Sequence, residues 1–322
     1  MLEETRNSNN RFARFVSNHI GKPGMHVSLR FFSLRFMLLS FYLGTKYPSI
    51  LVDVLKGRNI RASIHEKRRK DWENTRSYYA EHPKKVFGLW MYLNPDDFSP
   101  VSTSIATTGW LDLPLTTLLK KILRPGMLVI DVGANIGYYT LLFAKSVGKT
   151  GKVYSFEPES LNFKLLSKSI DANHLDNVEL KREALSDSQG TATLFLSNPR
   201  EPQGHSLVHD LGKGATFTPS TTLDDFWESL GKPRFDLIKI HVSGADDLVL
   251  AGARRLIHDL RPYLTFVFTP QRWKTRLIEL EALFDTYEVL EVVQGPQLGR
   301  KIDLQTLLIR DQVEVFLIPR RQ

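Results

Sequence analysis

The chain has 322 residues, of which 42% are hydrophobic and 24% charged, a composition typical of a globular protein. It contains no cysteine, which excludes disulfides, thiolate metal sites and a cysteine nucleophile. The net charge of +8 is uneven, because residues 1–85 hold 17 Lys and Arg against 7 Asp and Glu, whereas the remaining residues hold 26 against 28. The basic N-terminal part either attracts anionic partners or forms a solvated helical surface.

This charge distribution predicts two parts: a basic, mostly helical N-terminal extension at residues 1–85 and a larger domain at residues 86–322. The first residues are polar and do not resemble a signal peptide, so we expect a cytoplasmic protein. Residues 31–43 are the most apolar stretch, but Arg35 interrupts them and they are shorter than the ~20 residues that cross a bilayer. Residues 25–45 therefore form either a packed helix or a peripheral contact with a membrane surface.

Strands and helices alternate along the larger domain. In chain order we expect a strand ending in an Asn-Pro turn at residues 87–97, a buried strand at 127–133, a helix at 138–148, a strand at 152–158, a helix capped by Ser160 at 160–173, strands at 178–187 and 191–197, a buried strand at 235–242, a helix at 246–260, a strand at 263–270 and closing strands at 286–294 and 305–319. This order predicts an α/β fold with a mostly parallel sheet and helices on both faces. Ligands of such sheets bind at the carboxyl ends of the strands.

A glycine turn joins the first buried strand to its helix and carries the strongest functional signal. Asp131 ends the strand, and Gly133, Asn135 and Gly137 form the turn. Glycine and asparagine tolerate left-handed backbone conformations, and the start of a helix offers free N–H groups to a ligand. Glu157 ends the next strand, where its carboxylate can accept hydrogen bonds from both hydroxyls of a ribose.

Three kinds of nucleotide site compete for this pattern. A dinucleotide site needs GxGxxG, but the chain has GxNxG. The Gly148-Lys149-Thr150 string fails as a phosphate-binding loop, because Phe143 stands where that motif needs glycine. An S-adenosylmethionine site fits best, with the strand-end acid near the methionine ammonium and Glu157 on the ribose. The alternative is that both acids merely end their strands.

Six segments occur in the order and spacing of FkbM-type methyltransferases: IDVGANIGYYTLLFAK, VYSFEPES, VELKREALSDSQGTATL, GHSL, TTLDDF and IKIHVSGAD. The chain resembles this family over about residues 86–270, and residues 1–85 are not covered. The resemblance implies a Rossmann-like class I methyltransferase fold, S-adenosylmethionine as cofactor, and methylation, commonly of a hydroxyl oxygen. It places these residues at the cofactor: Asp131, Gly133, Asn135, Gly137, Glu157, Glu183 and Ala184.

The chain departs from the family pattern where the acceptor is expected. The family usually carries IKIDVEGAE, so His241 replaces an Asp, Ser243 replaces a Glu and Asp246 replaces another Glu; Thr269 stands where an acid usually ends the next strand. His241 is either the base that takes the acceptor proton or a hydrogen-bonded structural residue. Asp246 is a second candidate catalytic residue, although an acid at a helix start is also favoured by the dipole.

The functional prediction is an O-methyltransferase for a glycan or small-molecule acceptor, with an altered acceptor site. The alternative is a catalytically lapsed scaffold that binds S-adenosylmethionine or a protein partner. We expect no metal site, since His205 and His209 lack an acidic partner. A nucleic-acid substrate is disfavoured, because no Asn/Asp-Pro-Pro-aromatic tetrapeptide follows the fourth strand. The sequence gives no indication of oligomeric state.

Overall fold

A computed structural model describes residues 60–198, 204–273, 276–293 and 299–320. The chain divides into two compact units, Met1–Lys67 and Arg68–Gln322, and the fold below is that of the second. The membrane contact expected at residues 25–45 falls outside the described residues. Within the described ranges, every helix is too short or too polar to cross a membrane. The domain boundary expected at residue 85 stays a prediction.

The described part begins with helix α4 (Ile60–Glu81), which lies within the stretch expected to be helical. A hairpin follows, with strands β1 (Lys84–Val86) and β2 (Leu89–Met91). Phe87 and Gly88 form its turn with φ of 55° and 85°, the left-handed pair that a tight hairpin turn needs. The strand expected at residues 87–97 is present only as the short β2, because the chain reverses at Phe87 and Gly88 and the strand ends at Met91. Helices α5 (Pro100–Thr108) and α6 (Leu113–Ile122) come next.

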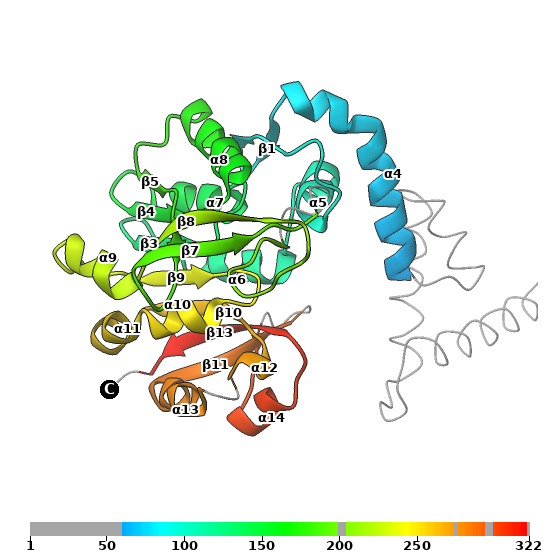
Figure 1. Cartoon of the computed structure of the whole chain (residues 1–322). Coiled ribbons are helices and arrows are strands. Elements are labelled where there is room, and N and C mark those ends of the chain that lie inside the picture. The colour runs from blue at the N-terminus through cyan, green and yellow to red at the C-terminus, as the bar shows by residue number, and fades with distance from the viewer. Residues whose placement is uncertain (1–59, 199–203, 274–275, 294–298, 321–322) are drawn as a thin grey trace, which may run out of the picture. The chain divides into compact units, whose positions relative to one another are not determined.

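Among the described residues, eight strands form the central sheet in the order β12-β11-β13-β10-β9-β3-β4-β5 (Figure 1). Neighbours from β10 to β5 run parallel, whereas β13, β11 and β12 pair antiparallel. The mostly parallel sheet is confirmed, and its switch point lies between β3 and β9. The strands are β3 (Leu128–Val132), β4 (Lys152–Phe156), β5 (Val178–Lys181), β9 (Leu237–Ile240), β10 (Tyr263–Phe268), β11 (Tyr287–Val292), β12 (Gly299–Lys301) and β13 (Val313–Pro319).

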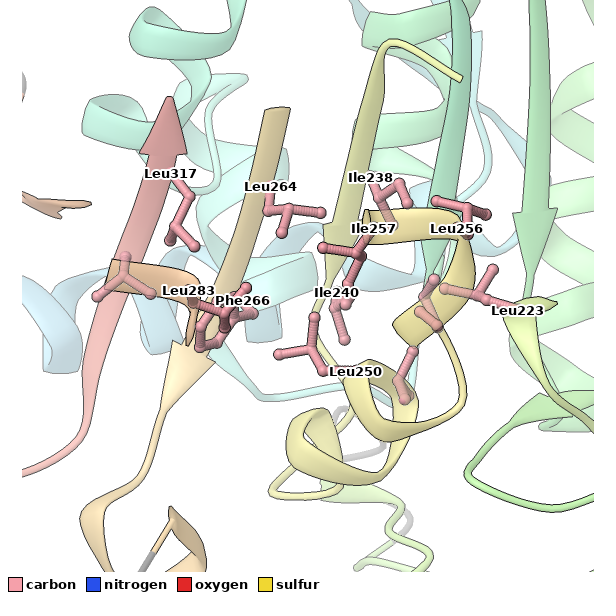
Figure 2. Packing of buried hydrophobic residues seen from close by; sticks show 14 of the residues in the cluster. Leu223, Ile238, Ile240, Leu250, Leu256, Ile257, Leu264, Phe266, Leu283 and Leu317 are labelled. Carbon is pink, nitrogen blue, oxygen red and sulfur yellow. The ribbon is translucent and has the colours of Figure 1, made fainter. Parts of the chain in front are cut away.

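Helices cover both faces of this sheet, as expected. Leu237 points to one core and its neighbour Ile238 to the other, because side chains alternate along a strand. Figure 2 shows Ile238 and Ile240 with Leu250 and Ile257, which follow them in the chain. Burying each such side chain contributes about 1.5–3 kcal/mol. One face is covered by α5, α6, α7 (Tyr138–Val147) and α8 (Ser160–Ala172), the other by α9 (Leu223–Ser229), α10 (Asp246–Ala251), α11 (Arg254–Leu260) and α13 (Leu277–Thr286).

A smaller sheet of three strands lies beside the central one, in the order β6-β8-β7. It contains β6 (Ala184–Leu185), β7 (Gly190–Phe195) and β8 (Ala215–Thr221). The strand expected at residues 178–187 is therefore two strands, β5 and β6, which belong to different sheets. This smaller sheet brings its residues to the carboxyl edge of the central sheet, where the cavity described below lies.

Three further local expectations are wrong for identifiable reasons. The helix expected at residues 246–260 breaks into α10 and α11 at Gly252, which packs so closely on the Ser186 carbonyl that a Cβ would overlap it. Glu159, not Ser160, caps α8, because its carboxylate accepts from the Asn162 N–H. The first part of the closing strand expected at residues 305–319 is helix α14 (Leu304–Leu308), and only β13 is extended. The short helix α12 (Pro270–Trp273) follows β10.

Candidate active site

A cavity of about 560 Å³ opens at the carboxyl ends of the parallel strands. Its walls come from the turns after β3, β4 and β9, from the starts of α6, α7 and α8, and from the smaller sheet. The Ser206 hydroxyl donates to the Ser243 carbonyl at 2.9 Å, which ties the loop after β7 to the loop after β9. Six of the predicted site residues line the cavity: Gly133, Asn135, Glu157, Glu183, Ala184 and His241. Asp131, Gly137 and Asp246 do not appear in this lining.

The glycine turn is folded tightly between the ends of β4 and β9. Gly133, Asn135 and Gly137 have φ of 72°, 52° and 98°, so each adopts the left-handed conformation that its residue type favours. The carbonyl of His241 approaches Gly133 so closely that a Cβ there would overlap it. Gly137 faces Leu166 of α8 in the same way. The turn therefore requires glycine both for conformation and for space.

Glu157 is a buried acid, 6% exposed, at the edge of the cavity. The Asn135 N–H donates to its Oε2 at 2.8 Å and the Glu159 N–H donates to its Oε1 at 2.9 Å. Desolvation raises the pKa of Glu157 to about 7, although these two N–H donors oppose the shift. Because each oxygen accepts only one backbone N–H, both oxygens retain lone pairs for a ligand.

Asn162 is a site residue that the sequence reasoning missed. It lies in the first turn of α8, is 1% exposed and lines the same cavity. Its side-chain Oδ1 has no hydrogen-bond partner among the described residues. Buried polar atoms normally have a partner, so this oxygen is suited to a donor on a bound ligand. No signal in the sequence distinguishes this Asn from the other polar residues of its helix.

Asp131 is fully buried behind the glycine turn. Its Oδ1 accepts from the Lys239 ammonium at 2.9 Å, and its Oδ2 accepts from the Thr140 hydroxyl at 2.7 Å. The same ammonium donates to the Gly133 carbonyl at 3.0 Å, so it joins the acid to the turn. Lys239 also lines the cavity and was missed. The available signal was a single lysine within the otherwise apolar run LIKI, since a buried charge needs a partner.

His241 directly follows β9 and lines the cavity. Its Nδ1 lies 4.0 Å from Oε2 of Glu314, a residue of β13 that the sequence reasoning also missed. Burial of the residue, followed by the nearby Lys239 ammonium, lowers the pKa of His241 from its ordinary value of 6.5. Since 53% of the side chain is accessible, hydration limits this decrease. The direction of this shift favours the neutral imidazole.

Asp246 opens α10 beneath the cavity and is 2% exposed. The Val267 N–H donates to its Oδ1 at 3.2 Å, whereas its Oδ2 has no partner among the described residues. Desolvation raises the pKa of Asp246 to about 7. Asp246 therefore does not line the cavity. Its raised pKa makes the stability of the folded protein depend on pH.

The Asp246→Asn variant is expected to gain stability relative to the wild type as pH rises from about 4 to 7. The pKa is 3.8 in the unfolded chain and about 7 when folded, so the folded acid holds a proton that the unfolded acid has lost. The free energy of unfolding therefore falls between these values by up to about 1.4 kcal/mol per pH unit for this group. Urea unfolding at pH 4 to 8 will show a shallower slope for the variant, and parallel curves would contradict this account.

Neither of the histidines considered for a metal lies in a ligand cluster. His205 lines the cavity, and the Ser197 N–H donates to its Nδ1 at 3.1 Å. His209 packs against Gly244 of the loop after β9. Within the described ranges, no three His, Asp or Glu side chains are grouped as metal ligands.

The strand order, the switch point and the cavity at the carboxyl edge define a Rossmann-like class I methyltransferase fold. The pattern of the methyltransferase FkbM domain matches residues 131–295, which include the glycine turn, Glu157 and His241. The chain belongs to the FkbM methyltransferase family. Residues 1–130 lie outside this match.

The chain is 24% identical over 209 residues to the 2-O-methyltransferase NoeI of Sinorhizobium fredii (strain NBRC 101917 / NGR234), covering 60% of this chain and 82% of that protein. It is 35% identical over 81 residues to the tRNA (adenine(58)-N(1))-methyltransferase catalytic subunit TRM61 of Cryptococcus neoformans, and this match spans only 19% of that protein and 24% of this chain. The solved structure of methyltransferase FkbM from Methylobacillus flagellatus KT aligns with a TM-score of 0.38 and 13% identity, over 76% of this chain and 58% of that one.

Proposed function

We propose that the protein is an S-adenosylmethionine-dependent O-methyltransferase whose acceptor is a hydroxyl group of a glycan or small molecule. The observation that carries this proposal is Glu157, which two backbone N–H groups hold at the edge of the cavity. A carboxylate fixed in this way accepts hydrogen bonds from two adjacent hydroxyls, as a ribose presents them. The family of the chain and its likeness to a 2-O-methyltransferase support the same activity.

The cavity residues fit S-adenosylmethionine. Glu157 would hold the ribose hydroxyls, Glu183 and Ala184 would contact the adenine, and the unpaired Asn162 oxygen would accept from a donor on the cofactor. Gly133 and Asn135 would hold the methionine portion. Asp131 acts indirectly, since Lys239 stands between its carboxylate and the turn. The cofactor supplies a methyl group on a sulfonium, and the protein supplies orientation and a base.

The acceptor side of the cavity contains His241, with Asp112, Gln312 and Leu111 also in its walls. A hydroxyl must lose its proton as its oxygen is methylated, and a neutral imidazole can take that proton. The lowered pKa of His241 favours this neutral form. Asp246 supports the floor of the site rather than touching the acceptor.

Calorimetric titration of the full chain with S-adenosylmethionine and S-adenosylhomocysteine tests the cofactor site. Glu157→Gln is expected to weaken binding by about 1–3 kcal/mol, because the amide offers one oxygen in place of two. Wild-type affinity will rise between pH 6 and 8, since Glu157 ionises at about 7 and the carboxylate is the better acceptor. Glu157→Gln will remove this pH dependence.

Glu179→Gln is the matched control, because Glu179 lies on β5 in exposed ion pairs with Lys152 and Lys181. It should leave affinity unchanged. The cofactor proposal is wrong if folded wild-type protein binds neither compound. If it binds both but releases no S-adenosylhomocysteine with any hydroxyl acceptor, the lapsed scaffold replaces the enzyme.

A further inference from the structure

A row of buried polar side chains crosses four strands of the central sheet beneath the cavity. Ser155, Asp131, Lys239 and Thr265 occupy matched register positions on β4, β3, β9 and β10. Asp131 and Lys239 form the ion pair described above. Thr265 is fully buried and donates to Oε1 of Glu314, which comes from β13 on the far side of β10. Glu314 therefore ends this row next to His241.

The Thr265 hydroxyl orients Glu314 and also lies 2.9 Å from the Val315 carbonyl, a second acceptor. Its hydrogen bond to Glu314 is 2.7 Å long and engages Oε1, so the second oxygen, Oε2, is the one nearer to His241. Glu314 does not line the cavity, whereas His241 does. The Glu314 side chain is 14% exposed against 53% for that of His241, so the carboxylate lies deeper in the protein than the imidazole.

We propose that Glu314 is a positioning residue for His241: its carboxylate accepts the Nδ1 proton of the imidazole and leaves the Nε2 lone pair for the proton of an acceptor hydroxyl. This inference rests on the proposed function, because it assumes a hydroxyl acceptor. The separation of 4.0 Å requires one side chain to turn before this bond forms, and such bonds commonly tighten when substrate is present. An acid that orients an imidazole base in this way acts through the base.

The acceptor oxygen loses its proton to Nε2 while it forms a bond to the methyl carbon. The bond between that carbon and sulfur breaks, and its electron pair remains on sulfur. The imidazolium that results is stabilised by the Glu314 carboxylate and later releases its proton to water.

Ionised Glu314 is needed for this arrangement. Desolvation raises the pKa of Glu314 to about 8. The negative charges of Asp112 and Asp246 raise this pKa further, whereas the Thr265 hydroxyl and the Lys239 ammonium lower it. A protonated Glu314 would instead donate to Nδ1 and place the ring proton on Nε2, which is then not a base. The pair thus has two coupled protonation steps, the upper one near pH 8. The groups that face Glu314 are Lys239 on β9, His241 after β9, Asp112 before α6, Tyr139 on α7 and Asp246 on α10.

Nitrogen-15 NMR of the full chain, labelled in its 9 histidines, tests the pairing without an acceptor. The His241→Ala spectrum identifies the His241 signals. In the wild type we expect these signals to shift in two steps, the upper near pH 8, with Nδ1 protonated above it. Glu314→Gln should abolish the upper step, and Glu314→Asp should restore a two-step curve.

Thr265→Val provides a second variant that keeps the acid. Loss of the Thr265 hydrogen bond should move the upper step upward by about half to one pH unit, because that bond favours the ionised carboxylate. Glu288→Gln, on β11 and paired with Lys301, is the control and should change nothing. One His241 step that Glu314→Gln leaves unaltered would overturn the proposal. S-adenosylmethionine titration of the same samples separately decides the proposed function.

Discussion

Lys239→Met is expected to lower the free energy of unfolding by about 3–5 kcal/mol, the loss typical when one partner of a buried ion pair is removed. The side chains of Lys239 and Asp131 are 3% and 0% exposed, so the variant leaves a carboxylate without water or a counter-charge. It also removes the hydrogen bond to the Gly133 carbonyl, so cofactor affinity should fall with stability. Urea unfolding and calorimetric titration measure the two effects.

The double variant Asp131→Asn/Lys239→Met separates the ion pair from the packing of the side chains. It removes both charges together, and its Asn can still accept from the Thr140 hydroxyl, so it should be more stable than Lys239→Met alone. Lys152→Met breaks an ion pair to Glu179 with both side chains 35% exposed, and should cost only about 0–1 kcal/mol. Equal losses in Lys239→Met and Lys152→Met would show that burial of the pair has no energetic effect.

Gly133→Ala is expected to destabilise the protein by about 2–5 kcal/mol and to abolish cofactor binding. Part of this loss is conformational, since an L-residue in the left-handed region costs about 1–2 kcal/mol. The rest is steric, because the new Cβ would overlap the His241 carbonyl and overpacking costs about 1–3 kcal/mol. Relief of the overlap must move the loop after β9, which carries the imidazole.

Gly109→Ala isolates the conformational part. Gly109 has φ of 77° against 72° for Gly133, and a Cβ at Gly109 would meet no atom within 4 Å. It should cost only about 1–2 kcal/mol and leave S-adenosylmethionine affinity unchanged. If the two alanine variants unfold at the same urea concentration, close contact at Gly133 does not contribute.

The cofactor half of the site was predictable because its residues are local in sequence. Gly133 and Asn135 lie in one turn, and Glu157 ends the next strand in a clear alternation of strands and helices. Parallel neighbours bring these two strand ends together, so the spacing alone placed them side by side. Their arrangement around the cavity agrees with that expectation, while their roles remain proposals.

The acceptor half was less predictable, because its contacts join distant segments. Glu314 reaches His241 only because β13 inserts antiparallel beside β10, and nothing in the local sequence of either residue indicates this pairing. Gly252 shows the same limit on a smaller scale. Residues 246–260 have the periodicity of one helix, and the break falls at Gly252, whose close approach to Ser186 is a contact of the tertiary fold.

The polar row across the sheet also constrains how this sequence can change over evolutionary time. Ser155, Asp131, Lys239 and Thr265 occupy adjacent register positions, and Glu314 contacts the last of them. Because directly contacting residues have coupled effects on stability, a neutral replacement at one position depends on the residue at the next. We therefore expect substitutions at these positions to be correlated. Selection should remove a single replacement that changes the charge and retain a pair of replacements that keeps the charges balanced.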